Sequence, residues 1–291
     1  MKAQINMQIE TPEFWENEWE KAREEAFFRR KRKSLKESVE LWNKRAERFS
    51  KNVGGERGKK RVERVFTWLE KQGVNFDGLR VLDIGAGPGV FALGFAGRVK
   101  EVVALEPAGA MVAFLKEQIE LNNIDNIRVI QDTWQEVDLE KHNLKQQFDL
   151  VFASMTPGVN NWETIDKALS CAKKYCFISG FARRRHSNAL SELWQALYGE
   201  TIPSRPVGMI YYLNLLYTKG FSMSVEIWEE SRELESEPEE AVSALKEELK
   251  HYGLEELPPD EQIRAFVHER MENGIFRQEY WSRMGQVLIK L

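Results

Sequence analysis

The stretch Val81-Leu82-Asp83-Ile84-Gly85-Ala86-Gly87-Pro88-Gly89 decides the fold of this chain. It joins a short apolar run to a glycine-rich turn, and a helical pattern, Val90 to Ala96, follows at once. Glycines at such a turn let the backbone come close to a bound ligand, and the first turn of the following helix offers free N–H groups. The stretch therefore predicts a strand, a ligand-binding loop and a helix in succession.

Strand and helix patterns alternate on the C-terminal side of this stretch. Short apolar runs predict strands at 80–84, 101–106, 127–131, 148–154 and 175–181, and helical spacing around 89–97, 108–122 and 162–173 separates them. In such a chain the crossovers are right-handed and the strands lie parallel. The fold class is therefore α/β, with a doubly wound, mostly parallel sheet.

The N-terminal part of the chain has a different pattern. Apolar residues at helical spacing, starting at Trp15 and again at Leu35, predict two helices. The basic run Arg29 to Lys33 lies between them and has the pattern of a solvated junction. We expect residues 1–60 to form a helical arm or lid, and residues 61–291 to form the main domain.

Beyond residue 181 the regular alternation ends. Phe221 to Trp228 alternates like a strand, and Met284 to Leu291 has the pattern of a last strand. The acidic segment between them predicts a helical insert at about 229–273.

Composition excludes several classes of protein. The chain has 291 residues, 42% of them hydrophobic, and a formal net charge of −4, so we do not expect a dedicated nucleic-acid binder. It has no apolar run long enough for a signal peptide or a membrane span, so we expect a cytoplasmic protein without a membrane partner. Two cysteines and four scattered histidines predict neither a disulfide framework nor a protein-held metal.

Acidic residues follow successive strands of the predicted sheet. Asp83 ends the first strand, Glu106 ends the second, 21 residues after Gly85, and Asp132 follows the third. Parallel α/β sheets bind their ligands at these carboxyl ends, where a carboxylate can accept both hydroxyls of a ribose. The acids and the glycine turn together predict an adenosine site.

At these residues the chain resembles the class I, Rossmann-like S-adenosylmethionine-dependent methyltransferases, whose first motif has an acid before GxGxG. The resemblance covers roughly residues 60–181. It implies S-adenosyl-L-methionine as methyl donor and S-adenosyl-L-homocysteine as product, with a seven-stranded sheet whose last strand is antiparallel. The implied cofactor-binding residues are Asp83, Gly85, Ala86, Gly87, Gly89, Glu106, Pro107, Asp132, Thr133 and Ser154. Within this set Gly85 and Gly87 would line the methionine part, Glu106 the ribose, and Asp132 with Thr133 the adenine.

The helices before the first strand commonly cover the cofactor in this family. The segment Trp42-Asn43-Lys44-Arg45-Ala46 resembles such a cover. A nicotinamide or flavin dinucleotide is the competing cofactor, but its usual fingerprint is GxGxxG, and position 90 is valine here.

The acceptor side carries a less specific pattern. Methyl transfer from a sulfonium depends chiefly on in-line positioning, so no catalytic triad is required. The candidate catalytic residues are Ser154, Thr156 and His186, and the candidate substrate-binding residues are Thr156, Asn160, Arg183 and Arg184. Two purely structural interpretations stay open: Ser154, Thr156, Asn160 and Asn161 cap the turn before the helix that begins at Trp162, and the arginines form a solvated basic turn.

Three functions remain open at this point. The first is methyl transfer to a small-molecule acceptor held at the ends of strands four and five. The second is methyl transfer to RNA or protein, with Arg29 to Lys33 and Lys59 to Arg64 contacting phosphates. The third is a non-catalytic S-adenosylmethionine-binding partner protein.

Overall fold

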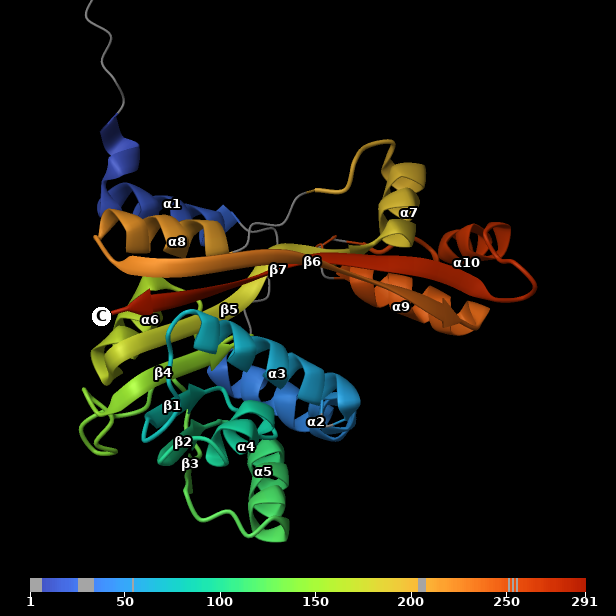
Figure 1. The fold of residues 1–291 in the computed structure, drawn as a ribbon. Coiled ribbons are helices and arrows are strands. Elements are labelled where there is room, and N and C mark those ends of the chain that lie inside the picture. The colour runs from blue at the N-terminus through green and yellow to red at the C-terminus, as the bar shows by residue number, and fades with distance from the viewer. Residues whose placement is uncertain are drawn as a thin grey trace, which may run out of the picture.

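The computed structural model describes residues 7–25, 34–53, 55–203, 208–250, 252, 254 and 256–291. Its centre is a seven-stranded sheet in the order β3-β2-β1-β4-β5-β7-β6 (Figure 1). The strands are β1 (Arg80–Ile84), β2 (Glu101–Leu105), β3 (Ile127–Ile130), β4 (Phe148–Ser154), β5 (Ala172–Ser187), β6 (Ser222–Ser236) and β7 (Phe276–Lys290). The first five are parallel, whereas β7 runs antiparallel to both β5 and β6. The predicted fold class is confirmed.

Helices cover both faces of this sheet. One face packs against α3 (Glu56–Lys71), α4 (Val90–Ala96) and α5 (Gly109–Leu121), and the other against α6 (Trp162–Cys171) and α8 (Gly208–Thr218). The buried side chains form a separate apolar cluster on each face. Phe152 of β4 and Phe177 of β5 stack with ring centroids 4.6 Å apart, so the two central strands are also joined through their side chains.

The N-terminal helices pack onto this core from two sides. The short 3-10 helix η1 (Met7–Glu10) precedes α1 (Pro12–Glu25), which packs on α8, and α2 (Leu35–Val53) packs on α5. The predicted junction Arg29 to Lys33 lies outside the described residues. No helix in the described part of the chain is both long and apolar enough to cross a bilayer.

Three strands are much longer than their sequence pattern predicts. β5 continues to Ser187 instead of ending at residue 181, and β6 continues to Ser236, so residues 229–236 of the predicted helical insert are strand. β7 begins at Phe276, eight residues before the predicted start. The glutamates of β6 led the sequence pattern to predict a helix for residues 229–236, because such charges are typical of a helix surface. In the structure, arginines of β7 pair with these glutamates across the ladder: Arg283 with Glu229 and Arg277 with Glu235.

The long strands carry a second helical unit, which we call the distal lobe. It consists of α7 (Asn188–Tyr198), α9 (Pro238–Lys250) and α10 (Asp260–Glu269), packed around the outer halves of β5, β6 and β7. Figure 1 shows the lobe at the far end of these strands, away from the rest of the sheet. It has its own apolar core, in which Leu245, Leu249 and Ile263 are fully buried.

Candidate functional site

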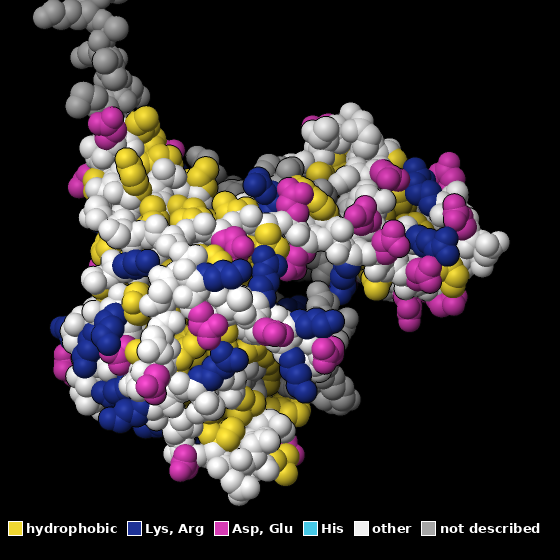
Figure 2. Space-filling view, in the orientation of Figure 1, with side chains coloured by type: hydrophobic (Ala, Val, Ile, Leu, Met, Phe, Trp, Pro, Cys, Tyr) yellow, Lys and Arg dark blue, Asp and Glu magenta, His cyan; other side chains and the backbone are white. Residues whose placement is uncertain are grey.

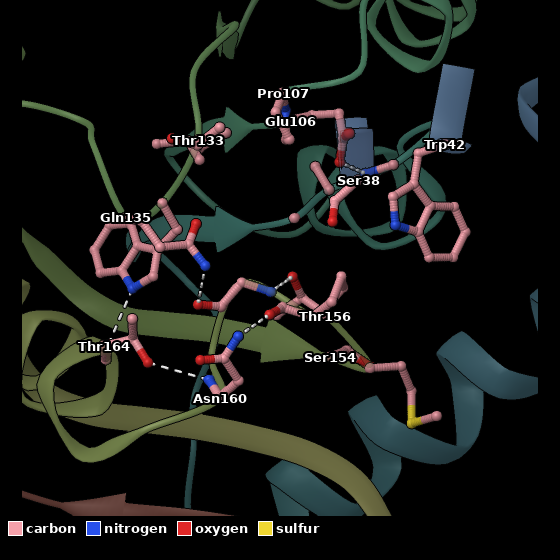
Figure 3. Close-up of a pocket in the computed structure, with 18 of the residues that line it drawn as sticks. Ser38, Trp42, Glu106, Pro107, Thr133, Gln135, Ser154, Thr156, Asn160 and Thr164 are labelled. Carbon is pink, nitrogen blue, oxygen red and sulfur yellow. Dashed lines mark hydrogen bonds between the residues drawn. The ribbon is translucent and has the colours of Figure 1, made fainter. Parts of the chain in front are cut away.

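A cavity of about 620 Å³ opens at the carboxyl ends of β1, β2 and β4. Its walls come from the glycine turn after β1, the segments after β2 and β4, the start of α6, and the N-terminal helices (Figure 3). This volume lies within the range of about 300–1,000 Å³ that is usual for ligand pockets. None of the described residues after 167 lines it, so the distal lobe takes no part in its walls.

The glycine turn has a backbone that only glycine adopts easily. Gly85, Gly87 and Gly89 have φ values of 73°, 57° and 91°, in the left-handed region. A Cβ atom on Gly85 would lie 2.1 Å from the Oγ1 atom of Thr156, so a larger residue is also excluded by contact. The turn therefore presents bare backbone to the cavity, as the sequence predicts.

Asp83 is a buried acid behind this turn. It is 3% exposed, and its Oδ2 atom has no hydrogen-bond partner among the described residues. Burial first, and then the negative charge of Glu106, raise the pKa of Asp83 from 3.8 to about 7, against the opposing effect of the Arg61 guanidinium. An unpartnered buried oxygen is costly, so Asp83 is suited to accept a hydrogen bond from a ligand.

Glu106 is fixed in place by two backbone donors. The N–H groups of Gly87 and Ala108 donate to its two carboxylate oxygens, each at 2.9 Å. Burial raises the pKa of Glu106, and these two hydrogen bonds act in the opposite direction. Each oxygen keeps lone pairs for further donors. Pro107 lies next to Glu106 in the cavity wall.

The residues after β3 divide between two roles. Thr133 lines the cavity together with Trp134, as the resemblance implies. Asp132 is not a lining residue; its Oδ1 atom accepts a hydrogen bond from the Thr133 N–H at 2.7 Å and so shapes the turn. Gln135 also lines the cavity, and its Nε2 atom donates to the Gly158 carbonyl at 3.1 Å.

Ser154 and Thr156 lie where β4 meets the glycine turn. Ser154 Oγ accepts a hydrogen bond from the Arg61 guanidinium at 2.9 Å and lies 2.9 Å from Ser179 Oγ. Thr156 packs against Gly85, and its Oγ1 atom accepts a hydrogen bond from the Gly158 N–H at 3.2 Å. Both hydroxyls line the cavity.

The two asparagines after β4 have different environments. Asn161 is the N-cap of α6 and forms a reciprocal capping box with Thr164. For this residue the interpretation as a cap before the Trp162 helix is therefore confirmed. Asn160 lines the cavity, and its Nδ2 atom donates to the Pro157 carbonyl at 2.8 Å. The side-chain oxygen of Asn160 has no such contact within the described part of the chain. In Figure 3, Thr156 and Asn160 face Thr133 and Gln135 across the cavity, and Ser38 and Trp42 close it at one side.

The interpretation of residues 183–186 as a basic turn is wrong, because β5 continues through them to Ser187. Arg183 pairs with Arg283 and His186 with Trp281 in the β5–β7 ladder, and Arg184 lies between them. Ser179 is the residue of β5 that pairs with the end of β4, so these positions lie about 13–23 Å further along the strand. The side chains of residues 183–186 lie outside the described residues.

Sequence patterns did not place three cations in the cavity wall: Arg23, Arg61 and Lys167. Arg61 lies over the ring of Phe91, 5.1 Å from its centroid, and donates to Ser154. The helical spacing of the sequence could have revealed Arg61. It shares one face of α3 with the buried Val65 and Leu69, and an arginine on an apolar face is unusual.

The predicted cover segment lies over the segment after β2. Trp42 lines the cavity, Ala46 packs against Ala108, and the Asn43 side chain accepts a hydrogen bond from the N–H of Ala110 at 3.0 Å. This bond satisfies a donor in the first turn of α5. Helix α2 is therefore tied to the wall that contains Glu106.

Comparison with known proteins agrees with this geometry. Residues 81–177 match the family model described as "Methyltransferase domain". A Haemophilus influenzae protein described as uncharacterized is 28% identical over 244 residues, which cover 80% of this chain and 82% of that protein. The ribosomal protein L11 methyltransferase of Acetivibrio thermocellus is 34% identical over 70 residues, 23% of this chain and 22% of that enzyme.

A solved structure shares the fold at low sequence identity. A candidate methyltransferase from Bacillus halodurans superposes with a TM-score of 0.50 and 15% identity, covering 77% of this chain and 97% of that one. The domain match places a methyltransferase domain over residues 81–177, and the sheet order confirms the predicted Rossmann-like fold.

Proposed function

We propose that this chain, whose central segment is a methyltransferase domain, transfers a methyl group from S-adenosylmethionine to a small-molecule acceptor. The proposal that S-adenosylmethionine is the methyl donor rests on the surroundings of Glu106. We call the cavity wall around Glu106, Asp83 and the glycine turn the cofactor seat. A buried carboxylate, fixed by two backbone N–H groups beside a bare glycine turn, suits the paired hydroxyls of a ribose.

The rest of the cofactor seat fits the other parts of S-adenosylmethionine. Asp83 has an unpartnered oxygen for the amino group, and the Arg61 guanidinium at the same end suits the carboxylate. Pro107, Thr133 and Trp134 offer a flatter wall for the adenine. We therefore propose that the cofactor-binding residues predicted from the sequence act together with Arg61, while Asp132 acts only through the shape of the turn.

When bound, S-adenosylmethionine supplies a methyl group that is already activated by a sulfonium. The task of the chain's own residues is therefore to hold a nucleophile in line and to exclude water. Ser154, Thr156 and Asn160 line the cavity beyond the glycine turn, and helix α2 closes it on the other side. We propose that the acceptor binds between these two walls, and that Thr156 and Asn160 orient it by hydrogen bonds.

The donor half is tested by calorimetry with S-adenosylmethionine and S-adenosylhomocysteine. We expect both to bind at one site per chain, and Glu106→Ala to weaken binding about 10–100-fold, because two hydrogen bonds to a charged group are lost. Glu120→Gln, a change of an exposed acid on α5, is the matched control and should bind like the wild type.

A wild-type protein that binds neither compound contradicts the proposed donor. Equal weakening in the Glu106 and Glu120 variants contradicts the assigned seat. Turnover is then tested with radiolabelled S-adenosylmethionine and a metabolite extract depleted of macromolecules. Label that appears only in a macromolecular fraction contradicts the small-molecule acceptor.

A further inference from the structure

We infer that the acceptor carries an anionic group, a carboxylate or phosphate, and that Arg23 of α1 binds it. This inference rests on the proposed function, because it concerns the acceptor half of the same cavity. It goes further by assigning the chemical class of the acceptor and a residue that selects it. Four observations support it: the surroundings of Arg23, the contacts of the other cations, the character of the wall, and the distribution of charge.

Arg23 lies in the last turn of α1 and lines the cavity. Its side chain is only 20% exposed, and its ion pair is with Glu20 of the same helix, at 2.7 Å. Glu20 is 51% exposed and does not line the cavity. A guanidinium has five N–H donors in a planar fork, and one carboxylate leaves some of them for a ligand in the cavity.

The other two cations of the cavity wall have contacts within the protein. Arg61 donates to Ser154, lies over Phe91 and lowers the pKa of Asp83. Lys167 donates to two carbonyl groups, those of Gln135 and Val137, and lies over the ring of Trp134. Among these three lining cations, Arg23 is the one whose described ion pair is with a residue of its own helix.

One wall of the same cavity is apolar. Helix α2 contributes Leu35, Val39 and Trp42 to it, with Ser38 as the polar member. An apolar wall with one cation suits an acceptor that has a flat or aliphatic body and one anionic end, since the wall buries the body while the guanidinium fixes its direction.

Charge is segregated along the chain in a way that the net value of −4 conceals. Residues 34–64, which span α2 and the first part of α3, contain 10 basic and 5 acidic side chains, whereas residues 226–282 contain 17 acidic and 6 basic ones. Figure 2 shows many of these acids on the distal lobe, which does not line the cavity. Helices α2 and α3, which contribute Trp42 and Arg61 to the cavity wall, therefore belong to a segment of net positive charge, and such a charge raises the local concentration of anions.

The test uses the full chain saturated with S-adenosylhomocysteine, and benzoate and benzamide as a charged and a neutral probe of the same shape. We expect calorimetry to show saturable binding of benzoate and much weaker binding of benzamide. Arg23→Met should weaken benzoate binding about tenfold or more, and Arg23→Lys should restore part of it, because the charge returns without the planar fork.

Lys21→Met is the matched control. Lys21 forms the same kind of pair with Glu18 at 2.7 Å on the same helix, but it does not line the cavity. The variant removes one positive charge from the same helix, so it should bind benzoate like the wild type. Unchanged binding of S-adenosylhomocysteine in both variants shows that the fold and the donor seat are intact.

Equal binding of benzoate and benzamide, or equal loss in the Arg23→Met and Lys21→Met variants, overturns the inference. Displacement of benzoate by a single-stranded RNA oligonucleotide also overturns it, if that displacement is lost in the Arg23→Met variant, because the anionic group would then belong to a polymer. Failure of the proposed function is distinct, since it appears as a wild-type protein that does not bind S-adenosylhomocysteine at all.

Discussion

Asp83 is costly for the fold where it is useful for binding. Its carboxylate is 3% exposed and lies beside the negative charge of Glu106. The folded state therefore holds the Asp83 proton more tightly than the unfolded chain, whose aspartates titrate near 4. At neutral pH a ligand with a positive group near Asp83 would relieve this unfavourable charge. In the proposed function, Asp83 would therefore couple cofactor binding to protonation.

The Asp83→Asn variant should be more stable than the wild type at neutral pH. The folded-state pKa of about 7 lies above the unfolded value, so ionising Asp83 destabilises the fold progressively as pH rises from about 4 to 7. The stability gained by the variant should therefore grow across that window and reach about 2–4 kcal/mol above it. Urea unfolding at pH 4, 5.5, 7 and 8 measures this gain.

Asp149→Asn is a control of opposite sign. Asp149 accepts a hydrogen bond from the Arg80 N–H and pairs with Lys174, and its pKa lies below the ordinary value. Its replacement should lower stability at neutral pH, and the loss should shrink as the pH falls below 4. A stability gain for Asp83→Asn that stays constant from pH 4 to 8 contradicts the assigned titration. The Asp83→Asn variant should also bind S-adenosylmethionine more weakly, because the charged hydrogen-bond acceptor at position 83 is gone.

At the scale of elements, sequence patterns are most informative where one strand and one turn determine the geometry. The sequence alone predicts β1, the glycine turn and the acid at the end of β2, because local backbone needs and apolar runs determine them. The outer half of β6 is different. Its burial alternates only weakly, and it is a strand because β7 pairs with it along its whole length. That partner lies some fifty residues away, so no local pattern reports it.

Arg23 and Arg61 show the same limit within the site. Their helices are visible in the apolar spacing, but the cavity that they line is made by helix α2 and by segments from four different strands and loops. Which charged residue of a helix faces such a cavity depends on how the helix docks, and docking is a tertiary property. Helix α2 illustrates it, since its Asn43 side chain accepts a hydrogen bond from the Ala110 N–H of α5, a residue far away in the sequence.

Loss of that hydrogen bond should loosen the cover over the cofactor seat. In the Asn43→Ala variant the N–H of Ala110 loses its acceptor in the first turn of α5, at a cost of about 1 kcal/mol. We expect S-adenosylmethionine to dissociate several-fold faster, and amide hydrogens of α2 to exchange faster. Stopped-flow displacement and hydrogen–deuterium exchange measure the two effects.

The neighbouring exposed residue Lys44 provides the control for this prediction. Lys44 is 72% exposed, and its pair with Glu40 is 3.9 Å long, so Lys44→Ala should leave both rates unchanged. Equal dissociation rates in the Asn43 and Lys44 variants contradict a covering role for α2.

At the scale of the whole molecule, the chain forms two bodies that share three strands. The sheet with its layers of helices contains the cavity, and the distal lobe has a separate apolar core. Helix α3 also contacts β6: the Arg64 guanidinium lies 3.7 Å from the ring centroid of Trp228 and within 4.0 Å of Glu226 and Glu230. The same helix carries Arg61 one turn earlier, in the cavity wall.

Because the two cores are separate, damage to the lobe should leave the cofactor seat intact. Leu245 is fully buried in the lobe, so Leu245→Ala should cost about 2–5 kcal/mol and speed hydrogen exchange in α9 and α10. Its affinity for S-adenosylmethionine should stay within about twofold of the wild type, since no described residue of the lobe lines the cavity.

The matched variant is Leu105→Ala, the same change at a fully buried leucine of β2, next to Glu106 and in the cavity wall. It should lower stability by a similar amount and also weaken cofactor binding, because the strand end that positions Glu106 loses its packing. If Leu245→Ala weakens binding as much as Leu105→Ala does, the lobe and the seat behave as one cooperative unit. The contact of Arg64 with Trp228 would then be the first place to look for the coupling, through an Arg64→Met variant in the same two assays.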